Sequence, residues 1–171
     1  MSRTSVLQRG ALAAAVIAAA AVSACSSGLL SDPQRPVASA KMVATQGNSV
    51  AGLVTFRRSG DQLSARVQLT GLPANSEHGF HIHEKADCTA PDGSSAGGHF
   101  NPSAMPHGPQ GGARHAGDMP NLRADAQGRV DTTLMVGGVT AGGGAANDIV
   151  GRSLIVHAAP DDYRTQPTRS E

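Results

Sequence analysis

The chain has 171 residues, of which 14 are basic and 13 acidic, so its formal net charge is only +1. This balance argues against a nucleic-acid partner and against a polybasic patch that binds membranes. With 21 glycines, 10 prolines and no helical periodicity, the sequence predicts short strands joined by turns. Aromatic residues make up only 2% of the chain, so we expect a core of valine, leucine, isoleucine and alanine.

Residues 1–24 are predicted to form an export signal of the lipoprotein type. Arg3 and Arg9 supply its positive start, and the apolar run over residues 11–22 is too short to span a bilayer. The run ends in Val-Ser-Ala-Cys, which resembles a bacterial lipobox, so we expect Cys25 to carry a lipid that anchors the mature protein to a membrane in the periplasm. The alternative is ordinary secretory cleavage after Ala24, which would give a soluble periplasmic protein.

After the signal, residues 25–36 are predicted to be a tether and residues 37–171 a single β domain. We expect strands at residues 37–46, 50–57, 62–69, 79–84, 129–136 and 153–158. Gly47-Asn48 and Gly60-Asp61 favour tight hairpins, and the glycine-rich residues 137–146 are expected to form a loop. Short strands at regular intervals indicate an all-β antiparallel sandwich or barrel.

Histidines are concentrated between residues 78 and 118, where six of the seven occur. His81 and His83 lie two apart in an expected strand, so both imidazoles should point to one face and can reach one ion. The next three, His99, His107 and His115, lie in a Gly- and Pro-rich stretch that ends near Asp118. The seventh, His157, follows a short apolar run.

Histidine and aspartate in this pattern are typical ligands of zinc and copper. Apart from His78, which we expect to be an ordinary loop or surface residue, the set has seven candidate ligands. Seven are too many for one tetrahedral ion, so two ions that share a ligand are the simplest interpretation.

Four segments, GFHIHE, ADCTAPDGSSAGGHFNP, RHAGDMPNL and SLIVHAAPDD, resemble the signature segments of bacterial periplasmic copper/zinc superoxide dismutases. The resemblance extends from about residue 38 to 168 and implies the Greek-key antiparallel β-barrel of that family. It implies copper on four histidines and zinc on three histidines and an aspartate, with one histidine in both sets: His81, His83, His99 and His157 for copper, and His99, His107, His115 and Asp118 for zinc. It also implies that Asp161 joins the two sites through His81 and His107.

The activity implied by the resemblance is dismutation of superoxide to oxygen and hydrogen peroxide in the periplasm. Copper would change oxidation state, zinc would hold the loop geometry, and the bridging His99 would take up and release a proton as the catalytic residue. The implied partners are superoxide as substrate and the membrane through Cys25. The oligomeric state stays open between a monomer and a homodimer.

The C-terminus departs from the family pattern. Cys88 occupies the loop half of the family's disulfide, but the chain ends at Glu171, before the segment that carries the partner cysteine, an active-site arginine and the last strand. Arg169 does not match that arginine's context, and Cys25 is a poor partner for Cys88 if it is lipidated. We therefore expect weak stability and reduced activity. The alternative function is a non-catalytic copper/zinc-binding lipoprotein of the same fold; a zinc-only structural module is less consistent with the copper-type histidines.

Overall fold

The computed structural model describes residue 32 and residues 34–165. The predicted signal, the lipidation site at Cys25, most of the predicted tether and the C-terminal residues 166–171 lie outside the described residues. Within the described part of the chain, no helix is long and apolar enough to cross a membrane.

Eight β-strands and one short 3-10 helix, η1 (Ser94–Ala96), make up the regular structure of the described residues, so the all-β prediction is confirmed. The strands are β1 (Ala38–Met42), β2 (Ala51–Ser59), β3 (Gln62–Thr70), β4 (Glu77–His78), β5 (Phe80–His83), β6 (Leu122–Arg123), β7 (Val130–Val136) and β8 (Ser153–Val156). They form a four-stranded sheet in the order β1-β2-β3-β7 and two pairs, β4-β6 and β5-β8. All strand pairs are antiparallel.

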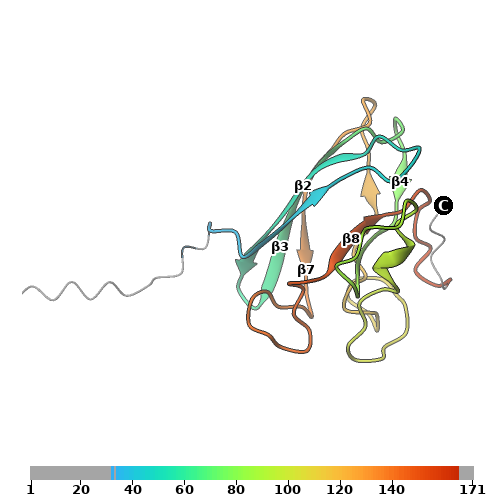
Figure 1. Ribbon diagram of the computed structural model, residues 1–171. Helices are drawn as coiled ribbons and strands as arrows, with labels where there is room; N and C mark the ends of the chain where they lie inside the picture. Colours follow the sequence, from blue (N-terminus) through green and yellow to red (C-terminus); the bar gives the residue numbers. More distant parts are fainter. Residues whose placement is uncertain (1–31, 33, 166–171) are drawn as a thin grey trace, which may run out of the picture. The chain divides into compact units, whose positions relative to one another are not determined.

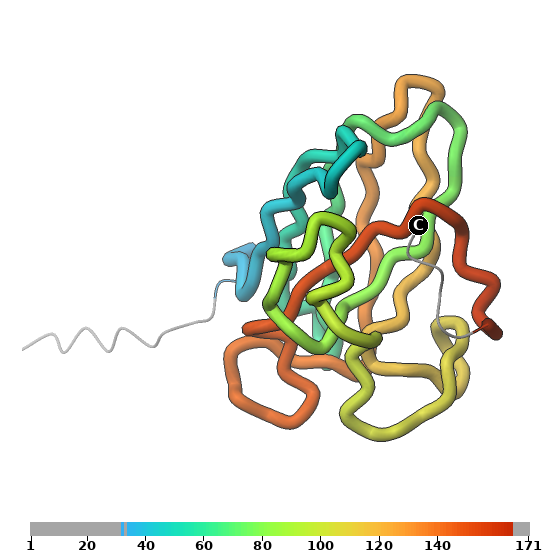
Figure 2. Tube along the Cα trace, turned by 45° about the vertical axis from the view of Figure 1, so that its right-hand side comes forward, coloured from blue at the N-terminus to red at the C-terminus, as the bar shows by residue number. Residues whose placement is uncertain are grey.

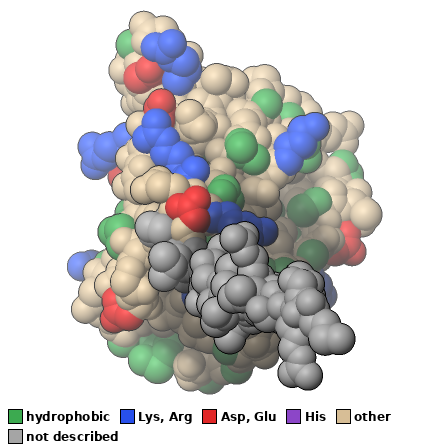
Figure 3. All heavy atoms as spheres, turned by 90° about the vertical axis from the view of Figure 1, so that its left-hand side faces the viewer, with side chains coloured by type: hydrophobic (Ala, Val, Ile, Leu, Met, Phe, Trp, Pro, Cys, Tyr) green, Lys and Arg blue, Asp and Glu red, His purple; other side chains and the backbone are tan. Residues whose placement is uncertain are grey.

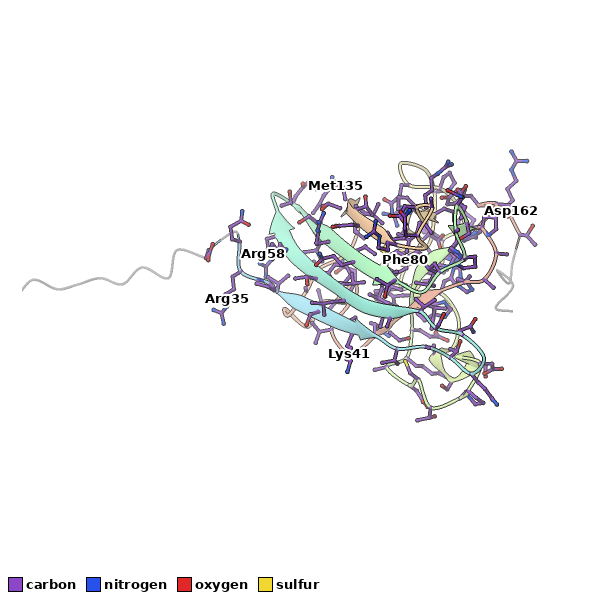
Figure 4. All side chains as sticks on the ribbon, turned by 90° about the horizontal axis from the view of Figure 1, so that it is seen from above. Arg35, Lys41, Arg58, Phe80, Met135 and Asp162 are labelled. Atoms are coloured by element: carbon purple, nitrogen blue, oxygen red, sulfur yellow. The ribbon has the colours of Figure 1, made fainter. Side chains whose placement is uncertain are left out.

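The four-stranded sheet packs against the rest of the fold through its apolar face. This face forms because apolar and polar residues alternate along β3. In β3 every second residue is buried, from Leu63 through Ala65 and Val67 to Leu69. The register sets Phe56 of β2 opposite Ala65, so large and small side chains meet across the pair. Phe80 of β5 is fully buried in the same core, and Figure 4 shows it among the side chains between the strands. Figure 1 shows β8 and the long loops on one side of this sheet.

Two hairpins were expected, and one is confirmed. Ser59 pairs with Gln62, so Gly60 and Asp61 form a two-residue turn in which Gly60 has a φ of 63°. The tight turn at Gly47-Asn48 is wrong: β1 and β2 do pair antiparallel, but β1 already ends at Met42 and an eight-residue connection leads to β2. The backbone N–H of Gln46 donates to the carbonyl of Pro91, so this connection is bound to a distant loop.

The glycine-rich loop after β7 is present as predicted, and it is organised around one carboxylate. Asp148, which is only 8% exposed, accepts hydrogen bonds from the backbone N–H groups of Gly142, Gly143, Gly144 and Val150. Figures 1 and 2 show this loop (dark orange) at the same end of the fold as the histidine-rich loop (yellow).

Candidate metal centre

Strand β5 brings the first two histidines to the centre of the site. All four of its residues are buried, and His81 and His83 share one face, as the i, i+2 spacing predicts. One edge of β5 pairs with β8, which places His157, the residue just after β8, beside them. On the other edge, the N–H of Ile82 donates to the carbonyl of Gly117 and its carbonyl accepts from Phe100. The histidine-rich loop is thereby fixed against β5.

Two groups of side chains that could hold a metal ion result from this arrangement. The four-histidine group comprises His81, His83, His99 and His157, and the mixed group comprises His99, His107, His115 and Asp118. Within each group, the candidate ligand atoms all lie within 4.8 Å of one another. His99 belongs to both groups, and its ring centroid is 3.9 Å from that of His81. Because an imidazole has two ring nitrogens, His99 can offer one to each group.

Asp118 is the centre of the mixed group. Its side chain is fully buried, and Nδ1 of His99 and Nδ1 of His107 lie 2.8 Å and 2.9 Å from its two carboxylate oxygens. The backbone N–H groups of Gly108 and His115 donate to the carboxylate. Burial opposes the negative charge, but the contact with His99, the hydrogen bond from the Gly108 N–H and the electrostatic effect of His107 and His115 outweigh it and lower the pKa of Asp118 from 3.8 to about 2. The carboxylate is therefore ionised at neutral pH and suits a cation.

The four-histidine group contains buried nitrogens that lack a hydrogen-bond partner in the described structure. Nε2 of His81 donates to Asp161 and Nδ1 of His83 donates to the carbonyl of Gly97, which leaves Nδ1 of His81 and Nε2 of His83 buried and unpaired. Such unpaired nitrogens are costly unless a ligand satisfies them. The donor set therefore fits a metal ion that prefers imidazole, such as copper or zinc.

The charge state of these histidines also suits metal binding. Burial, with a smaller effect from the neighbouring His99, lowers the pKa of His81 from 6.5 to about 2. Burial likewise lowers the pKa of His83 to about 4. Both imidazoles are therefore neutral near neutral pH, which is the form that binds metals.

Asp161 forms a hydrogen bond with one histidine of each group. Its Oδ2 accepts from Nε2 of His81 at 2.7 Å, and its Oδ1 accepts from Nε2 of His107 at 2.9 Å. The side chain of Asn121 fixes the backbone of Asp161 through two hydrogen bonds. Its Nδ2 donates to the Asp161 carbonyl, and its Oδ1 accepts from the Asp161 N–H. One carboxylate thus orients one histidine of each group.

The expectation for His78 is wrong. This residue is 4% exposed and lies in β4, where its Nδ1 contacts the carbonyl oxygen of His157 at 2.7 Å and its Nε2 contacts the Ser76 hydroxyl at 2.6 Å. It therefore supports the backbone at His157 and is not a surface residue. No sequence pattern indicates this role, because a two-residue strand has no periodicity.

Five of the seven histidines are buried: His78, His81, His83, His115 and His157. On the face drawn in Figure 3, lysine and arginine side chains are visible but no histidine is seen outside the grey atoms, as expected if the histidines are interior. In Figure 4, Arg58 and Asp162, the neighbour of Asp161, lie at opposite ends. Cys88 is exposed and forms no disulfide with any described residue.

The geometry agrees with the comparisons to known proteins. A family model described as copper/zinc superoxide dismutase matches residues 50–171. The chain belongs to the copper/zinc superoxide dismutase family. Membership of the copper/zinc superoxide dismutase family, as predicted from the sequence, is thereby confirmed, and copper and zinc are the metals of this family.

Relatives in the superoxide dismutase family cover most of the chain. The chain is 38% identical over 136 residues to Cu-Zn superoxide dismutase 2 of Aquifex aeolicus, covering 76% of this chain and 78% of the relative. It is 44% identical over 122 residues to the Cu-Zn superoxide dismutase of Schizosaccharomyces pombe, covering 67% and 75%. The crystal structure of a superoxide dismutase-like protein from Bacillus subtilis matches with a TM-score of 0.68 and 34% identity, covering 75% of this chain and 88% of that chain. These relatives support the same fold.

Proposed function

We propose that the protein dismutates superoxide to oxygen and hydrogen peroxide at a pair of metal ions that share His99. Copper would be held by the four-histidine group and zinc by the mixed group. The observation that carries this proposal is the presence of His99 in both groups, in a fold whose homologues are copper/zinc superoxide dismutases. When bound, copper supplies an ion that changes oxidation state, whereas zinc has no redox chemistry.

The protein's own groups would prepare the site in two ways. Asp161 fixes the ring of His81 and the Gly97 carbonyl fixes that of His83, so each presents its other nitrogen to the four-histidine group. Nδ1 of His99 is held beside Asp118. The other ring nitrogen of His99 could therefore hold a proton and pass it to the peroxide that forms when superoxide is reduced.

The test is a superoxide decay assay on the full chain loaded with copper and zinc, with metal content measured for each variant. The wild-type chain should bind both metals and accelerate decay. His81→Ala should lose copper and activity but keep zinc, whereas Asp118→Ala should lose zinc preferentially. A chain that binds both metals but leaves the decay rate unchanged would instead support the alternative, a non-catalytic metal-binding protein.

Location and anchoring are a separate part of the proposal. We propose that residues 1–24 are removed on export, that Cys25 is lipidated and that residues 25–36 tether the domain of residues 37–171 to a membrane in the periplasm. The support is the apolar run and the Val-Ser-Ala-Cys sequence alone. Intact mass of the exported protein should show a lipid on Cys25. Cys25→Ser should release the protein, whereas Cys88→Ser should leave it anchored; a water-soluble mature form with unmodified Cys25 would contradict the proposal.

A further inference from the structure

Arg114 makes a dense set of contacts beside the mixed group. Its side chain is partly buried, and all four of its hydrogen-bond acceptors are backbone carbonyls. Nη1 donates to the carbonyls of His115 at 2.8 Å, Ala116 at 3.3 Å and Asp118 at 3.2 Å. Nη2 donates to the carbonyl of Gly137 at 2.5 Å.

These acceptors belong to two separate parts of the fold, the turn that carries the candidate ligands and the end of a strand in the four-stranded sheet. The first three carbonyls lie in the tight turn of residues 115–118, where the N–H of Asp118 donates back to the carbonyl of His115. The fourth, that of Gly137, directly follows β7 of the four-stranded sheet. Arg114 therefore joins the turn that carries two candidate ligands to the end of the sheet.

The turn needs such a partner because several of its carbonyl oxygens converge on one side. Converging carbonyls repel one another, and a cation with several N–H donors compensates for this repulsion. Arginine suits the task because its planar guanidinium presents donors in a rigid fork, whereas lysine is a compact point charge on a flexible stem. Gln110 adds one neutral donor to the Asp118 carbonyl at 2.6 Å but contacts no other carbonyl of the turn in the described structure.

We propose that Arg114 is a positioning residue of the mixed group, which sets His115 and Asp118 in place for a zinc ion without touching the ion. This inference rests on the proposed function, because it assigns zinc to the mixed group. Partners that orient metal ligands from behind commonly change metal affinity by about 10–100-fold.

The experiment uses Co²⁺, a zinc substitute with a visible absorption band, titrated into the metal-free full chain. The band that disappears in His115→Ala reports the mixed group. Arg114→Gln should bind Co²⁺ about 10–100-fold more weakly. At saturation its band should also be shifted, because the two ligands are oriented differently. Arg123→Gln is the matched control: its side chain is 81% exposed, and this variant should behave as wild type.

Arg114→Lys keeps the charge and tests whether the fork is needed. It should bind Co²⁺ more weakly than wild type and also show a shifted band; if Arg114→Gln fails to fold, this variant decides the matter. Wild-type affinity and an unshifted band in the folded Arg114 variants would overturn the positioning role while leaving the metal site intact. If the wild-type chain itself shows no band that depends on His115, the proposed zinc site fails, and the positioning role fails with it.

Discussion

Nε2 of His81 lies 2.7 Å from Oδ2 of Asp161, and neither side chain is exposed to solvent. Because the carboxylate can only accept, the His81 proton is fixed on Nε2 and the lone pair is directed from Nδ1 into the four-histidine group. The other carboxylate oxygen makes the same contact with His107 of the mixed group. The metal affinities of the two groups should therefore depend on one carboxylate.

Asp161→Asn tests this dependence with almost no change in size. The amide can accept from one histidine N–H through its oxygen, but its NH₂ group would oppose the other N–H. We expect affinity for copper or zinc, or both, to fall by about 10–100-fold, measured by competition with a chelator. The control is Asp162→Asn, which changes the next residue. Asp162 is exposed, and its carboxylate accepts hydrogen bonds from the backbone N–H groups of Arg164 and Thr165. Equal metal affinities in both variants would show that Asp161 does not orient the ligands.

Gly117 is predicted to be irreplaceable because the histidine-rich loop packs directly on β5 at this point. A Cβ there would lie 2.2 Å from the carbonyl oxygen of Ile82 and 3.0 Å from the backbone nitrogen of Phe100. Gly117→Ala should therefore destabilise the fold by about 1–3 kcal/mol or displace the loop. Urea unfolding and metal content measure the two effects.

Gly143→Ala provides the control for Gly117→Ala. No atom lies within 4 Å of a Cβ at this position, and the backbone is not in the left-handed region. Its stability should stay within about 0.5 kcal/mol of wild type. If Gly117→Ala is equally mild and keeps both metals, the close packing of the loop on β5 is not required.

Asp148 should make the free energy of unfolding depend on pH in the acid range. Backbone N–H groups, first that of Val150 and then those of the three glycines, hold its pKa below the ordinary value of 3.8. A depressed pKa in the folded state gives stability that is fully present above the unfolded pKa and lost as the pH falls through the folded pKa. Asp148→Asn should thus cost about 1–3 kcal/mol near neutral pH.

The difference between Asp148→Asn and wild type should shrink below about pH 4, as wild type loses this contribution. Urea unfolding across this range measures the difference, with Asp131→Asn, a change on the exposed face of the sheet, as control. A difference that is constant with pH would mean that the charge of Asp148 does not stabilise the loop.

The sequence predicted much of the fold because apolar and polar residues alternate strictly along β3 and partly along the strands beside it. It also predicted the clustering of the histidines, since the i, i+2 spacing of His81 and His83 has a direct geometric meaning. The two-residue strands β4 and β6 were beyond such reasoning, because they exist only through their pairing with each other.

The contacts that support the site were the least accessible to sequence reasoning. Asp161 was assigned only through the family resemblance, because nothing local links it to residues 54 and 80 positions away. Arg114 was missed altogether, since its role depends on carbonyls that converge only after the loop has folded. Polar side chains that bind backbone atoms leave no periodic signal in a sequence.

The most direct test of the shared ligand is the electron paramagnetic resonance spectrum of Cu²⁺ in the four-histidine group, recorded with Co²⁺ or Zn²⁺ in the mixed group. A single imidazolate from His99 between the ions would couple the unpaired electrons of copper and cobalt, so we predict that Co²⁺ broadens or removes the copper signal. Zn²⁺, which has no unpaired electron, should leave that signal in place. A copper spectrum that is the same with either ion would contradict a site built on one shared histidine.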